Sequence, residues 1–330
     1  MRIVVDAMGS DDHPVPDVAG AVMAAREFGD EIILVGDEAR IKAELDKHDT
    51  TGLSLPVRHA SQAISMTDKP AEASRTKKDS SMHVGLGMVK NGEAEAFVTA
   101  GNTGGVLAVA TLHTLRRIRG VLRPALTVIF PLPTRPILLD IGANADCKPE
   151  YLAQFALMGS IYAERVLGVQ RPRVGVLSNG EEEGKGNQLV KETSQLLAQS
   201  SLNFIGNVEA KEFIAGGTDV AVADGFTGNM VVKVSEAISS HLINMIREEI
   251  KASPLTAVGG LLAKPAFDRV RRAMDPFEIG GAPLLGVNGV VIIGHGRSNA
   301  YAIKQAVGQA RRAVQQNVVA AIEAGLAEGR

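Results

Sequence analysis

Short apolar runs alternate with longer amphipathic segments along almost the whole chain. The short runs predict buried strands, because they have strand length and are bounded by Gly, Asn and Asp. We expect strands at 2–5, 31–35, 53–59, 96–100, 125–130, 137–141, 173–177, 202–205, 220–223 and 290–293. We expect helices at 15–28, 38–47, 80–89, 106–116, 150–166, 188–199, 230–251 and 300–326. This alternation predicts an α/β fold, doubly wound, with a mainly parallel sheet and helices on both faces.

The sequence shows no boundary between domains. No low-complexity linker and no repeat of fixed period interrupts residues 1–330, so we expect a single α/β domain. Residues 230–275 join a long predicted helix to an apolar segment, and we expect them to project as a helical hairpin. Residues 61–78 are polar and lack a clear period, which predicts a long loop.

Composition narrows the classes of function. Aromatic residues make up 4% of the chain and Trp is absent, which leaves little for stacking on bases, so we expect no nucleic-acid binding. The single cysteine, Cys147, cannot form an internal disulfide and suits a reducing compartment. The chain opens directly on a predicted strand, and no apolar run reaches the roughly 18 residues of a membrane-spanning helix. We therefore expect a cytoplasmic protein.

Six predicted strand ends carry the same mixture of Gly with Asn, Asp, Ser or Thr. They lie at 6–12, 101–105, 140–144, 178–187, 224–229 and 294–299. The carboxyl ends of strands in an open parallel sheet converge on one crevice, so we expect these loops to line it with amide and backbone donors. Such donors suit a phosphate or a developing oxyanion. The same residues are ordinary turn formers, so each loop taken alone is also compatible with a purely structural turn.

The stretch 178–187, Ser-Asn-Gly-Glu-Glu-Glu-Gly-Lys-Gly-Asn, has the composition of an anion-binding loop between a strand and a helix. It is not a P-loop, because three residues separate Gly180 from Gly184 and Gly186 follows Lys185. The first strand ends without a G-x-G-x-x-G fingerprint, and no His, Cys and Asp cluster has metal-ligand spacing. Cys147 has no local signature of a nucleophile, so we expect an incidental thiol.

The strand-end motifs, taken together, resemble those of a known family. They are Asp6-Ala7-Met8-Gly9, Gly101-Asn102-Thr103-Gly104, Asp140-Ile141-Gly142-Ala143-Asn144, residues 180–187, Asp224-Gly225-Phe226-Thr227-Gly228-Asn229 and Gly281-Ala282-Pro283-Leu284-Leu285-Gly286. In this order they resemble bacterial phosphate acyltransferase, the acyl-acyl-carrier-protein:phosphate transacylase of phospholipid synthesis. The resemblance extends from residue 1 to about residue 310.

The resemblance implies a reaction in which a carrier protein loaded with a fatty acyl group reacts with inorganic phosphate. The products are acyl phosphate and free carrier protein. It also implies a homodimer without metal or organic cofactor. The acyl phosphate then passes to a glycerol-3-phosphate acyltransferase in the membrane. Phosphate is already a nucleophile and a thioester is already reactive, so positioned donors are enough in principle and no acyl-enzyme is needed.

The resemblance and the loop chemistry together suggest roles for individual residues. We expect Lys185 to bind the phosphate or the oxyanion, and Asn229 to donate to the reacting carbonyl. Asp224 or His295 orients a donor or moves a proton, although His295 is equally compatible with an ordinary turn. Expected phosphate contacts are Asp6, Gly101, Asn102, Thr103, Gly104, Asn144, Gly184, Gly186 and Asn187.

Two surface features suggest partners. The basic clusters 115–119 and 269–272 are candidate docking sites for an acidic carrier protein, or solvated helix ends. Residues Pro254–Ala263 are apolar with Lys and Arg on both sides, which predicts peripheral contact with an anionic membrane. A dimer contact or a packed loop is the alternative for this segment.

Two other classes of function remain open from the sequence. One is an enzyme on a related fold, either a dehydrogenase, which the missing dinucleotide motif disfavours, or a short-chain phosphotransacetylase. The other is a noncatalytic scaffold that binds carrier protein and membrane.

Overall fold

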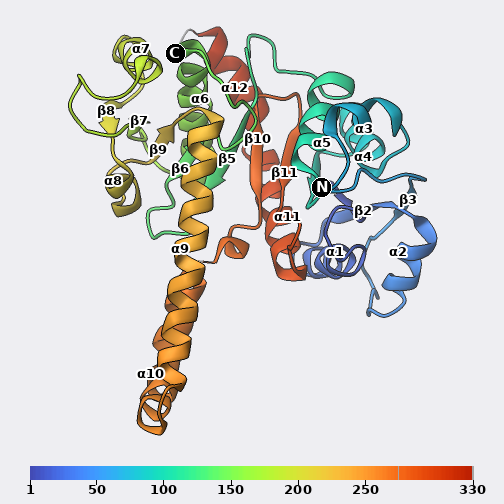
Figure 1. The fold of residues 1–330 in the computed structure, drawn as a ribbon. Coiled ribbons are helices and arrows are strands. Elements are labelled where there is room, and N and C mark those ends of the chain that lie inside the picture. Colours follow the sequence, from blue (N-terminus) through green and yellow to red (C-terminus); the bar gives the residue numbers. More distant parts are fainter. Residues whose placement is uncertain (274, 329–330) are drawn as a thin grey trace.

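The computed structural model describes residues 1–273 and 275–328. Within these residues eleven strands form one sheet, in the order β3-β2-β1-β4-β11-β10-β5-β6-β9-β7-β8 (Figure 1). The strands are β1 (Arg2–Asp6), β2 (Glu31–Gly36), β3 (Val57–His59), β4 (Ala96–Thr99), β5 (Ala125–Ile129), β6 (Ile137–Leu139), β7 (Val174–Leu177), β8 (Phe204–Val208), β9 (Val220–Val222), β10 (Ala282–Leu285) and β11 (Val290–Ile293).

The sheet reverses direction at its centre. β10 pairs antiparallel with both β11 and β5, and β5 pairs antiparallel with β6. All other pairs are parallel, so the predicted mainly parallel sheet is confirmed. The half built from β3, β2, β1, β4 and β11 therefore runs opposite to the half built from β6, β9, β7 and β8. Of the six strand-end loops expected to line one crevice, those at 101–105, 140–144, 224–229 and 294–299 border a common cleft, whereas residues 6–12 and 178–187 do not line it.

Helices cover both faces of the sheet, as predicted. They are α1 (Val15–Phe28), α2 (Glu38–Leu45), α3 (Pro70–Thr76), α4 (Ser81–Lys90), α5 (Thr103–Ala108), α6 (Pro149–Tyr162), α7 (Gln188–Ala198), α8 (Ala210–Ala215), α9 (Gly225–Lys251), α10 (Pro254–Ala273), α11 (Ala300–Gln315) and α12 (Val318–Ala327). In β1, Ile3 and Val5 pack in the cluster that contains α1 and α11, whereas Val4 packs with Leu86 of α4. Alternate side chains of one strand are thus buried on opposite faces, which explains the continuous apolar runs.

Several predicted elements differ in detail. The polar segment 61–78 contains a short helix, α3, which Pro70 begins. The predicted final helix is two helices, because Asn317 adopts a left-handed conformation with φ 49° between them. The predicted helix 106–116 is α5 followed by a π-helical turn at Val109–His113. The strand predicted at 53–59 is only the three residues of β3.

Helices α9 and α10 form a long hairpin that projects from the sheet (Figure 1). Residues Pro254–Ala263 form the first half of α10, next to the turn between the two helices at the far end of the hairpin. In the described part of the chain, no helix is long and apolar enough to cross a membrane.

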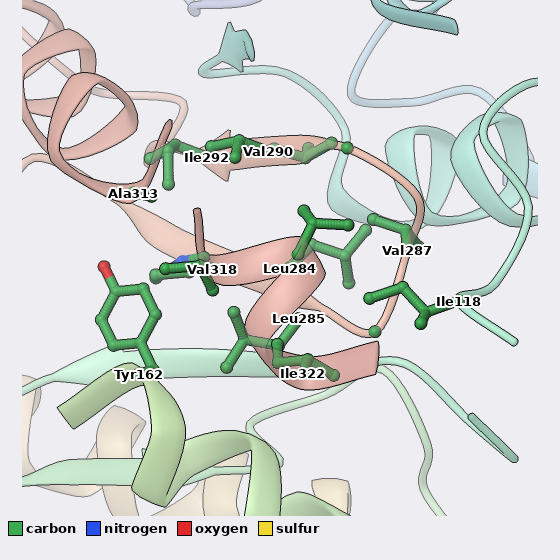
Figure 2. A pocket seen from close by; sticks show the side chains of 15 residues that line it. Ile118, Tyr162, Leu284, Leu285, Val287, Val290, Ile292, Ala313, Val318 and Ile322 are labelled. Atoms are coloured by element: carbon green, nitrogen blue, oxygen red, sulfur yellow. The ribbon is translucent and has the colours of Figure 1, made fainter. Parts of the chain in front are cut away.

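The core around β10 is tightly closed. Figure 2 shows Tyr162, Leu285, Val318 and Ile322 around a gap of about 20 Å³ between β10, β11 and α12. The Tyr162 hydroxyl accepts a hydrogen bond from Gln309 Nε2 at 3.1 Å, so its buried polar atom is satisfied. This gap is interior packing and is too small for a substrate.

Candidate active site

A cleft of about 460 Å³ crosses the centre of the molecule, where the two halves of the sheet meet. Its walls come from the ends of β4, β6 and β11, from β5 and β10, and from the first turns of α9. Among the predicted site residues, the cleft is lined by Gly101, Thr103, Gly104, Asn229 and His295. Strand ends from both halves therefore share one cavity even though the halves run in opposite directions.

Asp6 positions a turn that lines the cleft. Its side chain is fully buried, and it accepts hydrogen bonds from Met8 N at 3.0 Å and from Thr99 Oγ1 at 2.8 Å. Thr99 Oγ1 in turn accepts from Gly101 N at 3.0 Å. Burial raises the pKa of Asp6, and the hydrogen bonds oppose that rise. Asp6 therefore fixes the turn that begins at Gly101, and its carboxyl group does not open into the cleft.

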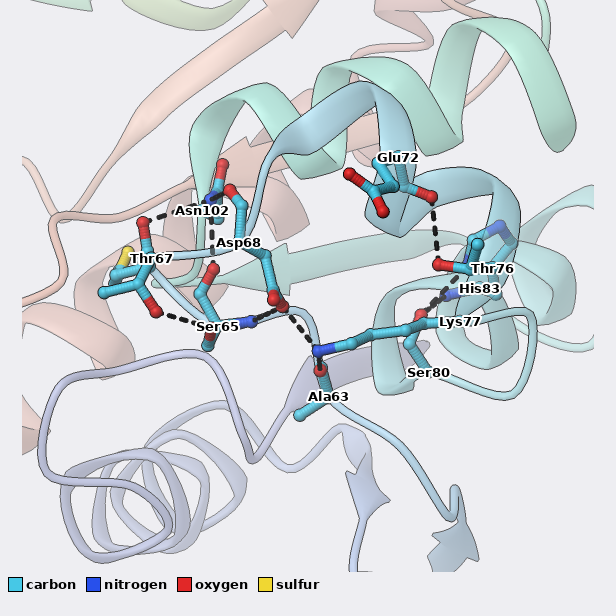
Figure 3. A network of polar contacts seen from close by, with 11 residues as sticks. Ala63, Ser65, Thr67, Asp68, Glu72, Thr76, Lys77, Ser80, His83 and Asn102 are labelled. Atoms are coloured by element: carbon cyan, nitrogen blue, oxygen red, sulfur yellow. Dashed lines mark hydrogen bonds and ion pairs between the residues drawn. The ribbon is translucent and has the colours of Figure 1, made fainter.

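Asn102 is also a positioning residue (Figure 3). Its Oδ1 caps α5 by accepting from Gly105 N at 3.0 Å. Its Nδ2 donates to the carbonyl of Ser65 at 3.0 Å, with longer contacts to the carbonyls of Met66 and Asp68. This places Met66 on the wall of the cleft.

Lys77 also stabilises the segment that contains Met66. Lys77 Nζ lies 2.5 Å from Asp68 Oδ2 and donates to the carbonyl of Ala63 at 2.9 Å (Figure 3). The ion pair lowers the pKa of Asp68. The polar character of residues 61–78 therefore reflects an ordered network beside the cleft.

The turn after β6 is organised by the buried carboxylate of Asp140. It accepts from the backbone N–H groups of Leu126, Gly142, Ala143 and Asn144, and from Asn144 Nδ2. Burial raises the pKa of Asp140, and these donors oppose the rise. Asn144 Nδ2 also donates to the carbonyl of Pro124 at 2.8 Å. Asn144 therefore holds the turn and does not line the cleft.

Helix α9 approaches this turn closely. A Cβ atom at Gly228 would lie 1.9 Å from the carbonyl oxygen of Asp140, so only glycine fits. Asp224 caps the helix by accepting from Thr227 N and Thr227 Oγ1, both at 2.8 Å. The cap and the close contact fix the first turns of α9 against the cleft.

Two side chains of α9 line the cleft. Asn229 Nδ2 donates to the carbonyl of Ile141 at 3.0 Å, and Lys233 follows four residues later. Lys233 Nζ lies 3.2 Å from Glu236 Oε2. The sequence analysis did not single out Lys233, although its spacing from Asn229 on one helix could have indicated it.

His295 also lines the cleft, in the loop after β11. The pKa of His295 is lowered, first by partial desolvation and then by the positive charges of Arg297 and Lys233. Its ring is therefore neutral at pH 7 and can accept a proton.

Lys185 does not line this cleft. The loop 178–187 follows β7 in the other half of the sheet, and the Lys185 side chain is exposed and extends over Gly180. Its backbone N–H donates to the carbonyl of Glu182 at 2.9 Å. Gly184 is exposed, Gly186 has φ 89°, and Asn187 caps α7 by accepting from Val190 N. The predicted phosphate contacts of this loop are thus separate from those of Gly101–Gly104.

An apolar groove of about 500 Å³ adjoins the cleft, with which it shares Val128, Ile129, Val232 and Glu236. Its other lining residues are Phe130, Pro131, Leu132, Ile214, Ser235, Ile238, Ser239, Ser240, Ile243, Asn244, Arg247, Arg271, Asp275 and Arg297. The combination of a polar cleft and a mainly apolar extension suits an amphiphilic substrate.

Cys147 is half-buried, and its pKa is raised to about 12 by desolvation and by the charge of Asp140. The thiol is therefore protonated and a poor nucleophile at neutral pH. In the described part of the chain, no group of three or more His, Cys, Asp or Glu side chains could hold a metal ion.

The chain matches the family model described as fatty acid synthesis protein over residues 1–321. It is 48% identical over 319 residues to the phosphate acyltransferase of Geobacter sulfurreducens, covering 96% of this chain and 92% of the relative. The chain belongs to the phosphate acyltransferase family. The family's enzyme from Herpetosiphon aurantiacus is 49% identical over 360 residues, which covers 99% of this chain and 98% of the relative.

Solved structures with the same fold support the architecture. A phosphotransacetylase from Streptococcus pyogenes matches with a TM-score of 0.62 and 16% identity, covering 98% of this chain and 94% of that one. A branched-chain phosphotransacylase from Enterococcus faecalis matches with a TM-score of 0.59 and 14% identity, covering 95% and 99%. At this identity the likeness concerns the fold alone.

Proposed function

We propose that this acyltransferase moves a fatty acyl group from the thioester of an acyl-carrier protein to inorganic phosphate in the central cleft. Family membership supports the acyl transfer and the phosphate acceptor. The observation that carries the choice of a fatty acyl group is the apolar groove that continues from the polar cleft. A short acyl group would not reach into this groove, so the groove favours a long acyl chain over the short-chain alternative.

The reaction balances without a further reactant. An oxygen of hydrogenphosphate attacks the thioester carbon, and the carbon–oxygen bond forms as the carbon–sulfur bond breaks. The thiol of the carrier arm leaves with the proton that hydrogenphosphate loses. Neutral His295 accepts this proton and returns it to the departing sulfur.

Charge stabilisation comes from two side chains of α9. Lys233 offsets part of the negative charge of the phosphate, and the Asn229 amide donates to the carbonyl oxygen as negative charge develops on it. Gly101–Gly104 bring backbone N–H groups and the Thr103 hydroxyl to the phosphate side. Asp6, Asn102, Asn144 and Asp224 act as positioning residues through the hydrogen bonds described above.

Lys185 is proposed as a second cation that acts when the loop 178–187 closes over the cleft entrance. The side chain makes no ion pair among the described residues, and the loop holds three glycines. Gly184, Gly186 and Asn187 would then reach the phosphate together with it.

The groove gives a test of chain-length preference. Ser239 lines the groove and not the cleft, so Ser239→Trp fills the groove without touching the reacting atoms. We expect Ser239→Trp to lower kcat/KM for palmitoyl-carrier protein by roughly tenfold or more, and to leave butyryl-carrier protein unaffected. Ala237→Trp, on the same helix but outside the groove, is the control. Equal losses with both donors, or none, would contradict the assignment of the groove.

We further propose that the hairpin tip contacts an anionic membrane, to which the long-chain acyl phosphate is delivered. Leu255, Leu261 and Leu262 are 83%, 70% and 79% exposed at the tip. Lys251 and Lys264 flank them, which gives an apolar surface with a cationic rim. A membrane-embedded glycerol-3-phosphate acyltransferase would take the product there.

A homodimer is proposed from the exposed face of α9. Large apolar side chains recur along it at Phe226, Met230, Val234, Leu242, Met245 and Ile246, outside the residues that line the acyl groove. A second copy of the chain can cover these side chains through a two-fold contact. Sedimentation velocity decides this proposal, because a monomer at micromolar concentration would contradict it.

A further inference from the structure

A second, strongly basic groove of about 770 Å³ lies beside the cleft. Four arginines line it: Arg116, Arg117, Arg119 and Arg123. All four are exposed, and among the described residues none of them forms an ion pair. The cluster therefore presents uncompensated positive charge on a protein whose net charge is -2.

The backbone of Arg116 is held in an unusual conformation. Arg116 has φ 65°, in the left-handed region that favours glycine. Its N–H donates to the carbonyl of Ala110 at 2.9 Å, and its carbonyl accepts from Asn288 N at 3.0 Å. The chain thus carries a long cationic side chain where glycine would be less strained, which points to a use for that side chain.

Apolar side chains lie among the charges. Leu112 and Leu122 are exposed on the groove, and the Arg123 guanidinium lies 5.8 Å from the centre of the Tyr151 ring. Arginine and aromatic side chains beside exposed leucines are typical of protein-binding surfaces, whereas a site for a free small anion needs only the charges.

The groove adjoins the cleft. Leu107 lines both the groove and the cleft, and Asn144 of the groove follows Gly142 of the cleft by two residues. A partner seated on the arginines can therefore pass a flexible acyl-bearing arm into the cleft.

We propose that this arginine groove docks an acidic face of the carrier protein that delivers the acyl thioester. The proposal rests on the proposed function, because it assumes a carrier-bound donor. Complementary charge steers the encounter, and the apolar side chains hold the complex once it forms. The basic cluster on α10 lies on the projecting hairpin, where Arg271 borders the apolar groove and not the arginine groove.

The test is a double charge reversal, Arg116→Glu with Arg119→Glu, at two exposed positions. We expect this variant to bind fluorescently labelled holo-carrier protein at least tenfold more weakly, and to lose the salt dependence of binding that the unchanged protein shows. We also expect a KM for acyl-carrier protein raised by a similar factor, with unchanged turnover of a small acyl-pantetheine thioester. Lys264→Glu with Arg269→Glu on α10 is the matched control.

Each outcome decides the proposal. Unchanged carrier binding in the groove variant, or equal loss in the α10 control, overturns it. Loss of turnover with both donors also overturns it, because the arginines would then belong to the reaction site. If the unchanged protein binds carrier through the groove but never forms acyl phosphate, the proposed function fails while the docking surface stands.

Discussion

At the scale of single residues, the candidate site contains two kinds of side chain. Some face the cleft, and others position them through hydrogen bonds. Asn229, Lys233 and His295 face the cavity, whereas Asp6, Asn102 and Asp224 use their polar atoms in hydrogen bonds to the backbone and to neighbouring hydroxyls. The sequence predicted all of these positions except Lys233. It could not distinguish the two roles, because residues that cap a turn and residues that bind an anion are chemically alike.

Lys185 is the residue whose role is most open to test. We expect Lys185→Ala to lower turnover about a hundredfold, the scale of one lost donor to an oxyanion, with an unchanged circular dichroism spectrum. Lys191→Ala, which removes an exposed lysine from α7, is the control. Near-normal turnover of the Lys185 variant would remove this lysine from the mechanism and leave Lys233 as the cation of the cleft.

Asp17 gives a prediction for stability as a function of pH. It is fully buried and hydrogen-bonded to Ser10 Oγ, and burial raises its pKa from 3.8 to about 7. The folded protein thus keeps a proton that the unfolded chain releases above pH 4. The stabilisation is complete below pH 4 and is lost as pH rises to about 7, by up to about 4 kcal/mol.

Asp17→Asn cannot titrate, so its free energy of unfolding should lack this slope between pH 4 and 7. Urea unfolding of both proteins across this range measures the difference. Parallel pH profiles for the two proteins would show that Asp17 is ionised in the folded state.

At the scale of elements, the hairpin of α9 and α10 was predictable because its apolar tip and cationic flanks are local features of the sequence. Two other elements were not predicted correctly because of single residues. Pro283 disguised β10, since proline is uncommon in central strands, and Asn317 split the last helix without a proline or glycine to indicate it. Such breaks depend on tertiary packing that a local pattern does not contain.

We expect a single negative charge at the hairpin tip to weaken its contact with the membrane. Leu261→Glu places a carboxylate on the apolar surface, so we expect it to lower binding to phosphatidylglycerol vesicles at least tenfold in a flotation assay. Leu196→Glu, at an exposed leucine on α7, should leave binding unchanged. Equal binding by the tip variant and the unchanged protein would refute the membrane contact.

At the scale of the whole molecule, the reversal of the sheet at β10 and β5 decides where the site lies. Alternating strands and helices predicted the fold class. The short connection 131–136 could have indicated the antiparallel pair of β5 and β6, because a parallel crossover needs a dozen or more residues, whereas β10 was not expected as a strand. The cleft therefore forms where the two half-sheets meet, and the loop of Lys185, which follows β7 farther out in its half, does not line it.

The central claim is direct transfer of the acyl group to phosphate, and a single-turnover experiment tests it most directly. Enzyme in excess over palmitoyl-carrier protein is mixed with labelled phosphate and quenched, and both the products and the intact enzyme mass are followed. We predict labelled acyl phosphate equal to the carrier thiol released, no release without phosphate, and no palmitoyl adduct on the enzyme. A palmitoyl group on Cys147 or on a serine that forms and decays during the turnover would contradict the account.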